Sequence, residues 1–488
     1  MPKSSILYIC QNCGTNHPKW QGQCTGCGEW NSLVEEVMES TQKSGFKVGK
    51  KLSSKELAKK VIDFSEVDLT SDSETRLSTN IGELDRVLGG GLVKGSVILL
   101  GGEPGIGKST LLTQLVLKLL FNNGGEKVAK VNKDKKTKKI TKSTRQKPKI
   151  IYACGEESPS QISLRIRRIL KNDHSFSTPG FGKDLLKKYK DSLLFVTSTD
   201  VDEITSIVVK EKPTLLIIDS IQTLKTDDLT GASGSVGQVR ECSDRLISVV
   251  KPLSIPTFLV GHVTKDGVIA GPKILEHMVD TVVELWGERT GQLRLVRSLK
   301  NRFGATDEVG VFKIEEYGLS EVSNPSELLL EHQDKAVPGS TTVCILEGTR
   351  PLLIEVQALV VNSQLAMPRR VGRGIELSRI QVLAAVLQKH CHLPLGSTDI
   401  FLNAAGGFKV KEPAVDLGLA VAIASSLKNK TIPQKILFIG EIGLLGEIRK
   451  VPYLDRRVKE AKRLGFKRVI SRETNKSITG VLREFGLG

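Results

Sequence analysis

Short apolar runs recur along the middle of the chain, and segments compatible with helices lie between them. The runs are Val97–Leu100, Ile150–Ala153, Leu193–Val196, Leu215–Ile218, Thr257–Val260 and Thr281–Leu285. Strand-like runs that alternate with helical segments are typical of βαβ units. Residues 76–325 are therefore predicted to form an α/β domain, with a parallel sheet and helices on both of its faces.

The composition divides the rest of the chain into three further blocks. Residues 8–30 contain four of the cysteines and two of the tryptophans. Residues 38–75 are rich in Ser, Lys, Glu and Asp, which predicts a linker. Residues 330–488 form a second mixed α/β block, with strands near Val343–Leu346 and Ile436–Ile439.

The bulk composition is that of a soluble globular chain with more than one domain. Of its 488 residues, 39% are hydrophobic and 26% are charged, and one hydrophobic core rarely serves more than about 300 residues. No apolar run approaches the ~20 residues of a membrane span, and the N-terminus lacks the apolar segment of a signal peptide. With eight cysteines in so long a chain, we expect a reducing, cytoplasmic compartment rather than a disulfide framework.

The net charge of +17 is unevenly distributed. The segment from Glu126 to Lys149 contains eleven Lys or Arg residues and two acidic residues, and so supplies +9 of that charge. It has no periodic apolar face, which predicts a solvated loop or a disordered segment. Non-specific contact of this segment with phosphates is the alternative.

A phosphate-binding loop follows the first apolar run. The stretch from Gly102 to Ser109 fits G-x-x-x-x-G-K-[ST] at every fixed position. Glycines let backbone N–H groups turn around a triphosphate, at a helix N-terminus that carries partial positive charge. We expect Lys108 to contact the β- and γ-phosphates of ATP and the Ser109 hydroxyl to bind Mg²⁺. The predicted nucleotide-binding residues are Gly102, Glu103, Pro104, Gly105, Ile106, Gly107, Lys108, Ser109, Thr110 and Asp219.

Two other strand ends carry acidic residues of the same site. The run Leu215–Ile218 ends in Asp219, as a Walker B segment does, and ligands collect at the carboxyl edge of such sheets. Asp219 is therefore predicted to hold Mg²⁺ through water, together with Ser109. An earlier run ends in the pair Glu156-Glu157, and one of the two is expected to orient and deprotonate the attacking water. We favour Glu156, but the sequence does not separate adjacent acids.

Lys300 and Arg302 form a compact pair of positive charges after the strand-like segment Gln292–Leu299. At the period of two of a β-strand, both side chains are expected to point to the same side. Such a pair can stabilise a transferring phosphoryl group that belongs to a neighbouring subunit. From the spacing alone, a surface basic pair unconnected with ATP is the favoured alternative.

The N-terminal cysteines form two knuckles, Cys10-x₂-Cys13 and Cys24-x₂-Cys27, separated by ten residues. Four thiolates at this spacing suit tetrahedral Zn²⁺ without an open coordination position, so the site is predicted to be structural. A redox C-x-x-C pair is the alternative, but it predicts one motif within a βαβ unit rather than two in a short module.

Together these motifs resemble the bacterial RadA/Sms family of recombination and repair ATPases. The matching stretches are the four-cysteine ribbon, Ser78–Gly91, Gly102–Thr110, Gly155–Ser158, Val239–Cys242, Gly261–Gly267, Gly271–Asp280 and Lys300–Gly304, the last of which is diagnostic of the family. The resemblance covers nearly the whole chain, except the 38–75 linker and residues 122–149, which then look like an insertion.

The resemblance implies a RecA-like core that assembles into hexameric rings, with ATP between the subunits. Lys300 and Arg302 then become trans-acting phosphate contacts. The resemblance also implies binding of single-stranded and branched DNA, with the RecA recombinase as a partner. No membrane partner is expected, because no apolar run is long enough to span one. Candidates for a phosphate sensor and DNA-facing loops are His262, Lys265 and Lys273.

Residues 330–488 resemble the Lon protease domain but depart from it at the catalytic positions. Lon enzymes need a nucleophilic Ser after a Pro and an activating Lys on a following helix. Here Ala414 and Asp455 stand at those positions, which predicts a proteolytically inactive scaffold. In the family this domain supports ring assembly and offers basic surface to DNA. The arginines expected to contribute are Arg369, Arg370, Arg373 and Arg379.

The predicted architecture is a RecA-like P-loop ATPase core with an N-terminal Cys₄ zinc ribbon and a C-terminal Lon-protease-like α+β domain. The predicted function is a DNA-dependent ATPase that drives branch migration and strand exchange with RecA during recombinational repair, with ATP, Mg²⁺ and Zn²⁺ as cofactors. One alternative is an ATP-dependent Lon-type protease, against which Ala414 and Asp455 argue. The other is a RecA-like regulatory ATPase that acts on proteins, against which the ribbon and Lys300–Gly304 argue.

Overall fold

The computed structural model describes residues 5–10, 15–26, 28–38, 76–122, 148–172, 191–263, 269–270, 274–287, 292–330, 336–405 and 410–488. Nearly all of the predicted linker and of the predicted insertion lies outside these residues. The chain divides into two compact units, of which the second contains Glu288–Leu293, Asp307–Val311 and Val322–Gly488. Among the described residues, no helix is both long and apolar enough to cross a membrane.

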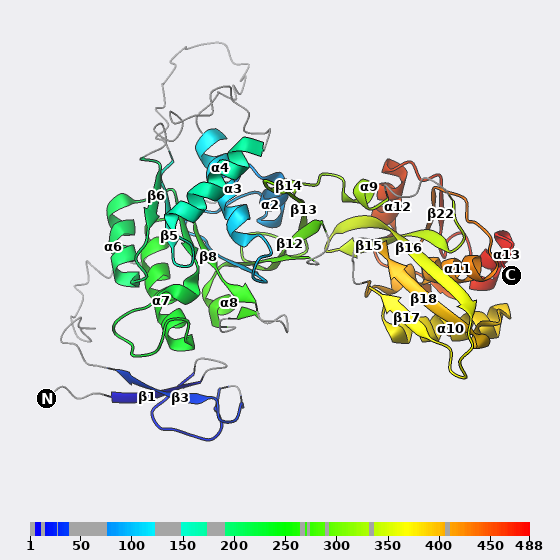
Figure 1. Ribbon diagram of the computed structural model, residues 1–488, viewed down its shortest axis with the longest axis horizontal. Coiled ribbons are helices and arrows are strands. Elements are labelled where there is room, and N and C mark those ends of the chain that lie inside the picture. The colour runs from blue at the N-terminus through cyan, green and yellow to red at the C-terminus, as the bar shows by residue number, and fades with distance from the viewer. Residues whose placement is uncertain are drawn as a thin grey trace, which may run out of the picture. The chain divides into compact units, whose positions relative to one another are not determined.

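The first unit contains a nine-stranded sheet with the order β14-β13-β12-β11-β4-β8-β7-β5-β6 (Figure 1). Its six parallel strands coincide with the six predicted apolar runs. They are β4 (Val97–Gly102), β5 (Ile150–Cys154), β6 (Leu193–Val196), β7 (Leu215–Asp219), β8 (Thr257–Val260) and β11 (Thr281–Trp286).

Three further strands extend one edge of this sheet in antiparallel fashion. They are β12 (Leu293–Asn301), β13 (Val309–Glu315) and β14 (Gly318–Glu321). β12 pairs with β11 and β14 pairs with β13 in antiparallel register. The six predicted runs thus form the parallel sheet, and these three strands add an antiparallel edge, because the short connections between them leave no room for a crossover helix.

Helices cover both faces of the sheet, and the side chains of each strand alternate between two cores. Ile98 and Leu100 belong to the core beneath α2 (Gly82–Val87), α3 (Lys108–Asn122) and α4 (Pro159–Asn172). Val97 and Leu99 belong to the core of the opposite face. The helices of that face are α6 (Val201–Glu211), α7 (Val236–Val250) and α8 (Ile274–Met278), and a 3₁₀ turn, η3 (Ile221–Thr223), follows β7.

Two small sheets accompany this core. The N-terminal ribbon has the strand order β2-β1-β3 and is antiparallel throughout. Its strands are β1 (Ser5–Cys10), β2 (Asn16–His17) and β3 (Leu33–Met38). A second, two-stranded sheet pairs β9 (His262–Val263) with β10 (Ile269–Ala270).

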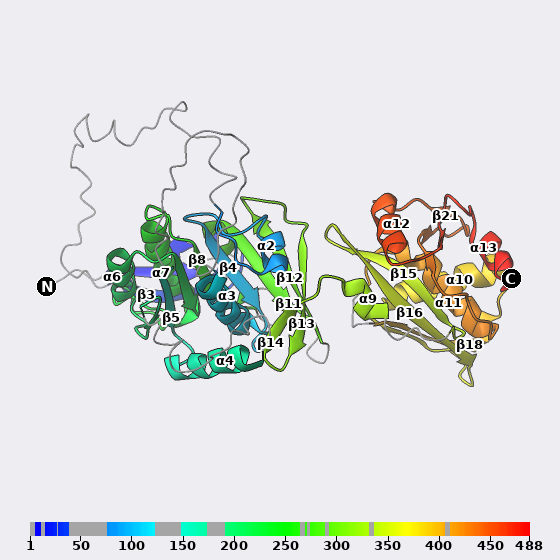
Figure 2. The ribbon, with the colours of Figure 1, turned by 90° about the horizontal axis from the view of Figure 1, so that it is seen from above.

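The second unit is an α+β fold (Figure 2). Its six-stranded sheet has the order β17-β18-β16-β15-β19-β22. Its strands are β15 (Ser340–Glu347), β16 (Arg350–Asn362), β17 (Arg370–Arg373), β18 (Thr398–Ala404), β19 (Ile436–Phe438) and β22 (Arg468–Ile470), with a hairpin of β20 (Glu441–Ile442) and β21 (Ile448–Arg449). Its helices are α9 (Pro325–Leu330), α10 (Leu377–Cys391), α11 (Asp416–Leu427), α12 (Leu454–Arg463) and α13 (Ile478–Glu484), and α11 is buried from Asp416 to Ser425.

Candidate nucleotide site

The phosphate loop connects β4 to α3 at the carboxyl edge of the sheet. Gly102, Gly105 and Gly107 have φ values of 154°, 78° and 117°, a region that side chains rarely adopt. At Gly102 a Cβ atom would also lie 2.5 Å from the carbonyl oxygen of Leu285. The loop conformation therefore requires glycine at these positions.

Lys108 begins α3, and its side chain turns back over the loop. Its Nζ donates hydrogen bonds to the carbonyl oxygens of Gly102 at 2.8 Å and Glu103 at 3.0 Å. Burial lowers the pKa of Lys108, while the negative charges of Asp219 and Glu156 act in the opposite direction. The buried ammonium thus lies within the loop, with two carboxylates close enough to affect its titration.

Asp219 ends β7 and is 3% exposed. Its Oδ2 accepts a hydrogen bond from the Tyr152 hydroxyl at 2.6 Å, and Oδ1 has no hydrogen-bond partner among the described residues. Burial raises the pKa of Asp219, and hydrogen bonds from Tyr152 and Ser109 oppose this effect. A buried, unpartnered carboxylate oxygen beside the Ser109 hydroxyl is a donor set that suits a hard cation such as Mg²⁺.

The adjacent acids Glu156 and Glu157 occupy different environments. Glu156 is exposed; its carboxylate accepts a hydrogen bond from the Ser220 hydroxyl, and its backbone N–H donates to the Asp219 carbonyl at 3.2 Å. Glu157 instead forms an ion pair with Arg165 of α4 at 2.5 Å. The carboxylate of Glu156 thus lies beside Ser220, at the end of β7. The carboxylate of Glu157 instead binds the segment after β5 to α4.

Lys300 and Arg302 lie at the amino end of β4, opposite the phosphate loop. Asp280 marks this end, because its backbone N–H donates to the Val97 carbonyl at 3.0 Å. Arg302 Nη1 lies 3.2 Å from Asp280 Oδ1. β4 contains six residues, so its two ends lie about 17 Å apart. Within one subunit, these cations are therefore distant from the loop.

The strand period does not explain how the two cations come together. β12 ends at Asn301, so Arg302 follows the strand and the alternation of side chains does not apply to it. Lys300 Nζ donates to the carbonyl oxygens of Glu276 at 2.6 Å and Val279 at 2.8 Å, beside α8. Burial lowers the pKa of Lys300, and the nearby charge of Arg302 lowers it further. Both cations therefore contact residues at the junction between α8 and β11.

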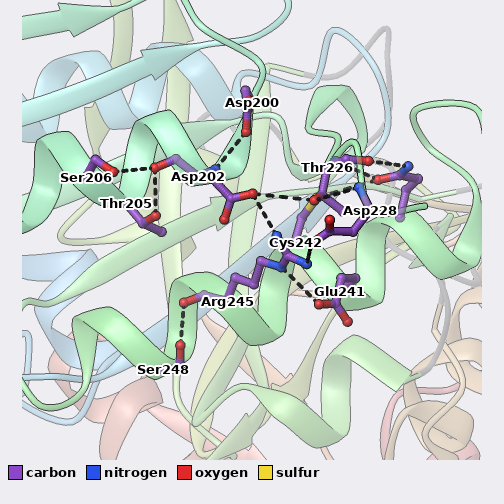
Figure 3. A network of polar contacts seen from close by, with 11 residues as sticks. Asp200, Asp202, Thr205, Ser206, Thr226, Asp228, Glu241, Cys242, Arg245 and Ser248 are labelled. Carbon is purple, nitrogen blue, oxygen red and sulfur yellow. Dashed lines mark hydrogen bonds and ion pairs between the residues drawn. The ribbon is translucent and has the colours of Figure 1, made fainter. Parts of the chain in front are cut away.

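Side chains of α7 hold the loop that follows η3. Arg245 forms ion pairs with Asp202 of α6 at 2.7 Å, with Asp228 of the loop at 2.5 Å and with Glu241 at 2.9 Å (Figure 3). The amide of Gln238 donates to the loop carbonyls of Thr226, Leu229 and Gly231. Sequence reasoning missed this network; the available signal was a glutamine on the buried face of an amphipathic helix.

The ribbon places the described cysteines in surroundings that suit thiolates. Cys10 and Cys24 are 0% and 1% exposed, whereas Cys13 and Cys27 lie outside the described residues. The Gly26 N–H donates to Cys24 Sγ at 3.3 Å. His17 Nε2 lies 3.4 Å from the same sulfur. Donors directed at a buried sulfur stabilise a thiolate, so these residues fit a thiolate-bound metal.

The second unit contains a buried ion pair next to the predicted inactive catalytic position. Ala414 is 1% exposed, in a 3₁₀ turn (Pro413–Val415), and Asp455 is exposed in the first turn of α12. Between these elements, the fully buried Arg457 pairs with Glu412 and donates to the Cys344 carbonyl at 2.6 Å. The ion pair connects α12 to the 3₁₀ turn. The turn itself carries no nucleophilic side chain.

The four arginines expected to face DNA differ in exposure. Arg369 and Arg373 are exposed, and Arg370 is half-buried and donates to the Leu395 carbonyl at 2.7 Å. Arg379 has a side chain that is 14% exposed; it pairs with Asp416 at 3.4 Å and donates to the backbone carbonyls of residues 410–412. The expectation for Arg379 is therefore wrong, because its guanidinium is used within the fold.

Three family models match parts of the chain. Residues 8–35 match a rubredoxin metal binding domain, residues 64–268 an AAA domain, and residues 355–475 the subunit ChlI of Mg-chelatase. Among solved structures, a KaiC-like protein from Pyrococcus horikoshii covers 51% of this chain and 98% of its own, at 18% identity and a TM-score of 0.36.

Curated relatives match almost the entire chain. DNA repair protein RadA of Halalkalibacterium halodurans is 43% identical over 97% of this chain and 94% of its own. The proteins of the same name from Bacillus subtilis and Pseudomonas aeruginosa are 42% and 43% identical, each over 96% of this chain and 93% of its own. With its RecA-like P-loop core, zinc ribbon and Lon-like C-terminal domain, the chain belongs to the RadA family of DNA repair proteins.

Proposed function

We propose that the chain is a DNA-dependent ATPase of recombinational repair that works as a homo-oligomeric, hexameric ring. The observation that supports this proposal is that the phosphate-binding residues and Arg302 lie at opposite edges of the same sheet. The phosphate loop, Lys108 and Asp219 lie at the carboxyl edge, whereas Arg302 lies at the amino edge beside Asp280. Phosphoryl transfer needs cations around the transferring group. β4 spans about 17 Å between these two edges, so Arg302 serves the nucleotide of a neighbouring subunit.

Each residue of the site has a distinct role in this proposal. The loop N–H groups and Lys108 bind the phosphates of ATP, and Thr110 follows in the first turn of α3. Ser109 and Asp219 hold Mg²⁺, which neutralises charge on the phosphates when it is bound. The exposed Glu156 takes a proton from the attacking water, and the Ser220 hydroxyl orients its carboxylate.

Lys108→Ala tests the ATPase directly. The variant should bind DNA as the unaltered chain does but lose ATP turnover, because the ammonium that contacts the phosphates is gone. The assay measures ATP hydrolysis with and without a branched DNA substrate. Lys118→Ala, on the same helix but outside the loop, is the matched control and should retain turnover. Unchanged DNA-stimulated hydrolysis by Lys108→Ala would refute the assignment.

The finer part of the proposal is that hydrolysis drives branch migration and strand exchange together with RecA, on single-stranded and branched DNA. Its support is the family membership and the exposed Arg369 and Arg373 near β17, which can contact DNA phosphates. The test follows the growth of heteroduplex in a RecA strand-exchange reaction. The unaltered chain should accelerate it and Lys108→Ala should not; equal acceleration by both would exclude a motor role.

A proteolytic function is not supported. Ala414 offers no nucleophile, and Asp455 stands where the activating lysine is expected. Casein incubated with the chain and ATP should therefore remain intact. Cleavage that disappears in Lys108→Ala would instead support a protease.

A further inference from the structure

Tyr152 carries a hydroxyl group that core packing does not require. It is the third residue of β5, in the otherwise apolar run Ile-Ile-Tyr-Ala-Cys, and it is 1% exposed. Its side chain belongs to the core beneath α3, and its ring centroid lies 6.3 Å from that of Phe195. A phenylalanine would fill the same space, so the hydroxyl needs a separate explanation.

The register of the sheet brings this hydroxyl to Asp219. Cys154 is the register partner of Asp219, and Tyr152 is the partner of Ile217, two residues earlier on β7. Partners in a parallel pair share a face, and so do residues two apart along a strand. Tyr152 and Asp219 therefore lie on the face that α3 covers, where the phenol donates to Asp219 Oδ2 at 2.6 Å.

The hydrogen bond distinguishes the two oxygens of the Asp219 carboxylate. Oδ2 is taken by the phenol, whereas Oδ1 is buried and has no hydrogen-bond partner among the described residues. A hydrogen bond to a charged carboxylate is short and directional. Without it, the carboxylate keeps the hydrogen bond from Ser109 and is drawn toward the nearby ammonium of Lys108.

We propose that Tyr152 is a positioning residue of the nucleotide site: its hydroxyl fixes the Asp219 carboxylate so that Oδ1 stays available to the magnesium ion of the bound nucleotide. The inference rests on the proposed ATPase function. It adds a residue that touches neither phosphate nor metal and acts through Asp219.

The test is Tyr152→Phe in the full chain, which removes one oxygen atom and retains the ring. Binding of a fluorescent, non-hydrolysable ATP analogue is measured as free Mg²⁺ is varied, and bound Mn²⁺ is counted by electron paramagnetic resonance. The concentration of Mg²⁺ needed for half-maximal effect should rise about tenfold, the size expected for a hydrogen bond to a charged group. Binding of the analogue without Mg²⁺ should stay within about twofold of the original.

Phe195→Leu is the matched control, because it disturbs the same part of the core and leaves the hydroxyl in place. Thermal melting without nucleotide compares the folding of the two variants. The proposal is overturned if both variants change the Mg²⁺ requirement equally, or if Tyr152→Phe keeps the original requirement. If the unaltered chain itself shows no Mg²⁺-dependent binding, the proposed ATPase function fails as well.

Discussion

Arg302 and Asp280 form an ion pair at the amino end of β4, with 3.2 Å between Nη1 and Oδ1. Asp280 also pairs with Lys251 at 2.9 Å and accepts a hydrogen bond from the Val97 N–H at 3.1 Å. Its side chain is only 5% exposed, whereas that of Arg302 is 54% exposed. A buried carboxylate thus forms an ion pair with Nη1 of an exposed guanidinium, at the sheet edge opposite the phosphate loop.

This relationship predicts that Arg302→Ala subunits will inhibit unaltered subunits in mixed assemblies. If the guanidinium completes a neighbour's site, each variant subunit inactivates a site that it does not itself contain. ATPase activity should therefore fall faster than the fraction of unaltered subunits as the two are mixed. Arg297→Ala is the matched control, since Arg297 lies on β12, shortly before Arg302 in the chain, but pairs with Glu284. Activity strictly proportional to composition would exclude a trans contact.

The two adjacent acids should separate by function when each is changed to glutamine. Glu156→Gln should lower kcat by about a hundredfold or more, the usual contribution of a general base, and should leave nucleotide binding intact. Glu157→Gln removes the ion pair with Arg165, so it should cost about 1 kcal/mol of stability and largely spare kcat. Single-turnover hydrolysis and thermal melting of both variants make the comparison. The opposite pattern would assign the base to Glu157.

His17 should affect how firmly the ribbon retains its metal, which we expect to be Zn²⁺. The imidazole is buried, and Nε2 lies 3.4 Å from Cys24 Sγ. Loss of such a supporting hydrogen bond typically weakens metal binding by about tenfold or more. His17→Phe should therefore release zinc faster to a chelating dye than the original chain does. Lys19→Ala, on the exposed surface of the same ribbon, is the control, and equal release rates in all three proteins would contradict the role.

The parts of the nucleotide site that could be predicted from sequence each lie within one short segment. The phosphate loop is a continuous motif, and Asp219 follows directly from the end of an apolar run. Strands of the parallel sheet were predictable for the same reason, because each is a continuous buried run. Local patterns therefore sufficed wherever the chemistry is local.

Contacts between distant segments could not be predicted in this way. Tyr152 and Asp219 are 67 residues apart in the chain, and only the register of β5 against β7 brings them together. The choice between Glu156 and Glu157 likewise depends on Arg165 and Ser220, which belong to other elements. Such relationships depend on strand order and register, which a single sequence does not specify.

Arg457 should be one of the most sensitive positions of the second unit. Its guanidinium is fully buried, pairs with Glu412 and donates to the Cys344 carbonyl. Removal of one partner from a buried pair leaves the other charge uncompensated, so Arg457→Met should destabilise the unit by about 3 kcal/mol. Arg456→Met changes the neighbouring residue of α12, which is exposed, and should cost less than about 0.5 kcal/mol. The free energy of unfolding is measured by urea unfolding, with hydrogen exchange of α12 as the probe. Equal losses of stability in Arg457→Met and Arg456→Met would show that the buried pair contributes nothing.

Asp416 should make the stability of the second unit depend on pH. Burial raises the pKa of this carboxyl to about 6 from its ordinary value of 3.8, although Arg379 and the Ile442 N–H oppose the shift. The folded chain therefore binds more protons than the unfolded chain between these values. The stability that Asp416 contributes to the folded chain is fully present below pH 3.8 and is lost as the pH rises through about 6.

The difference between these pKa values corresponds to about 3 kcal/mol. Asp416→Asn should remove this slope, because the amide does not titrate. The measurement is the urea dependence of hydrogen exchange in α11 at a series of pH values, corrected for intrinsic exchange rates. Asp455→Asn removes an exposed carboxylate from the same unit and should keep the slope. If Asp416→Asn retained it too, another group would have to be responsible.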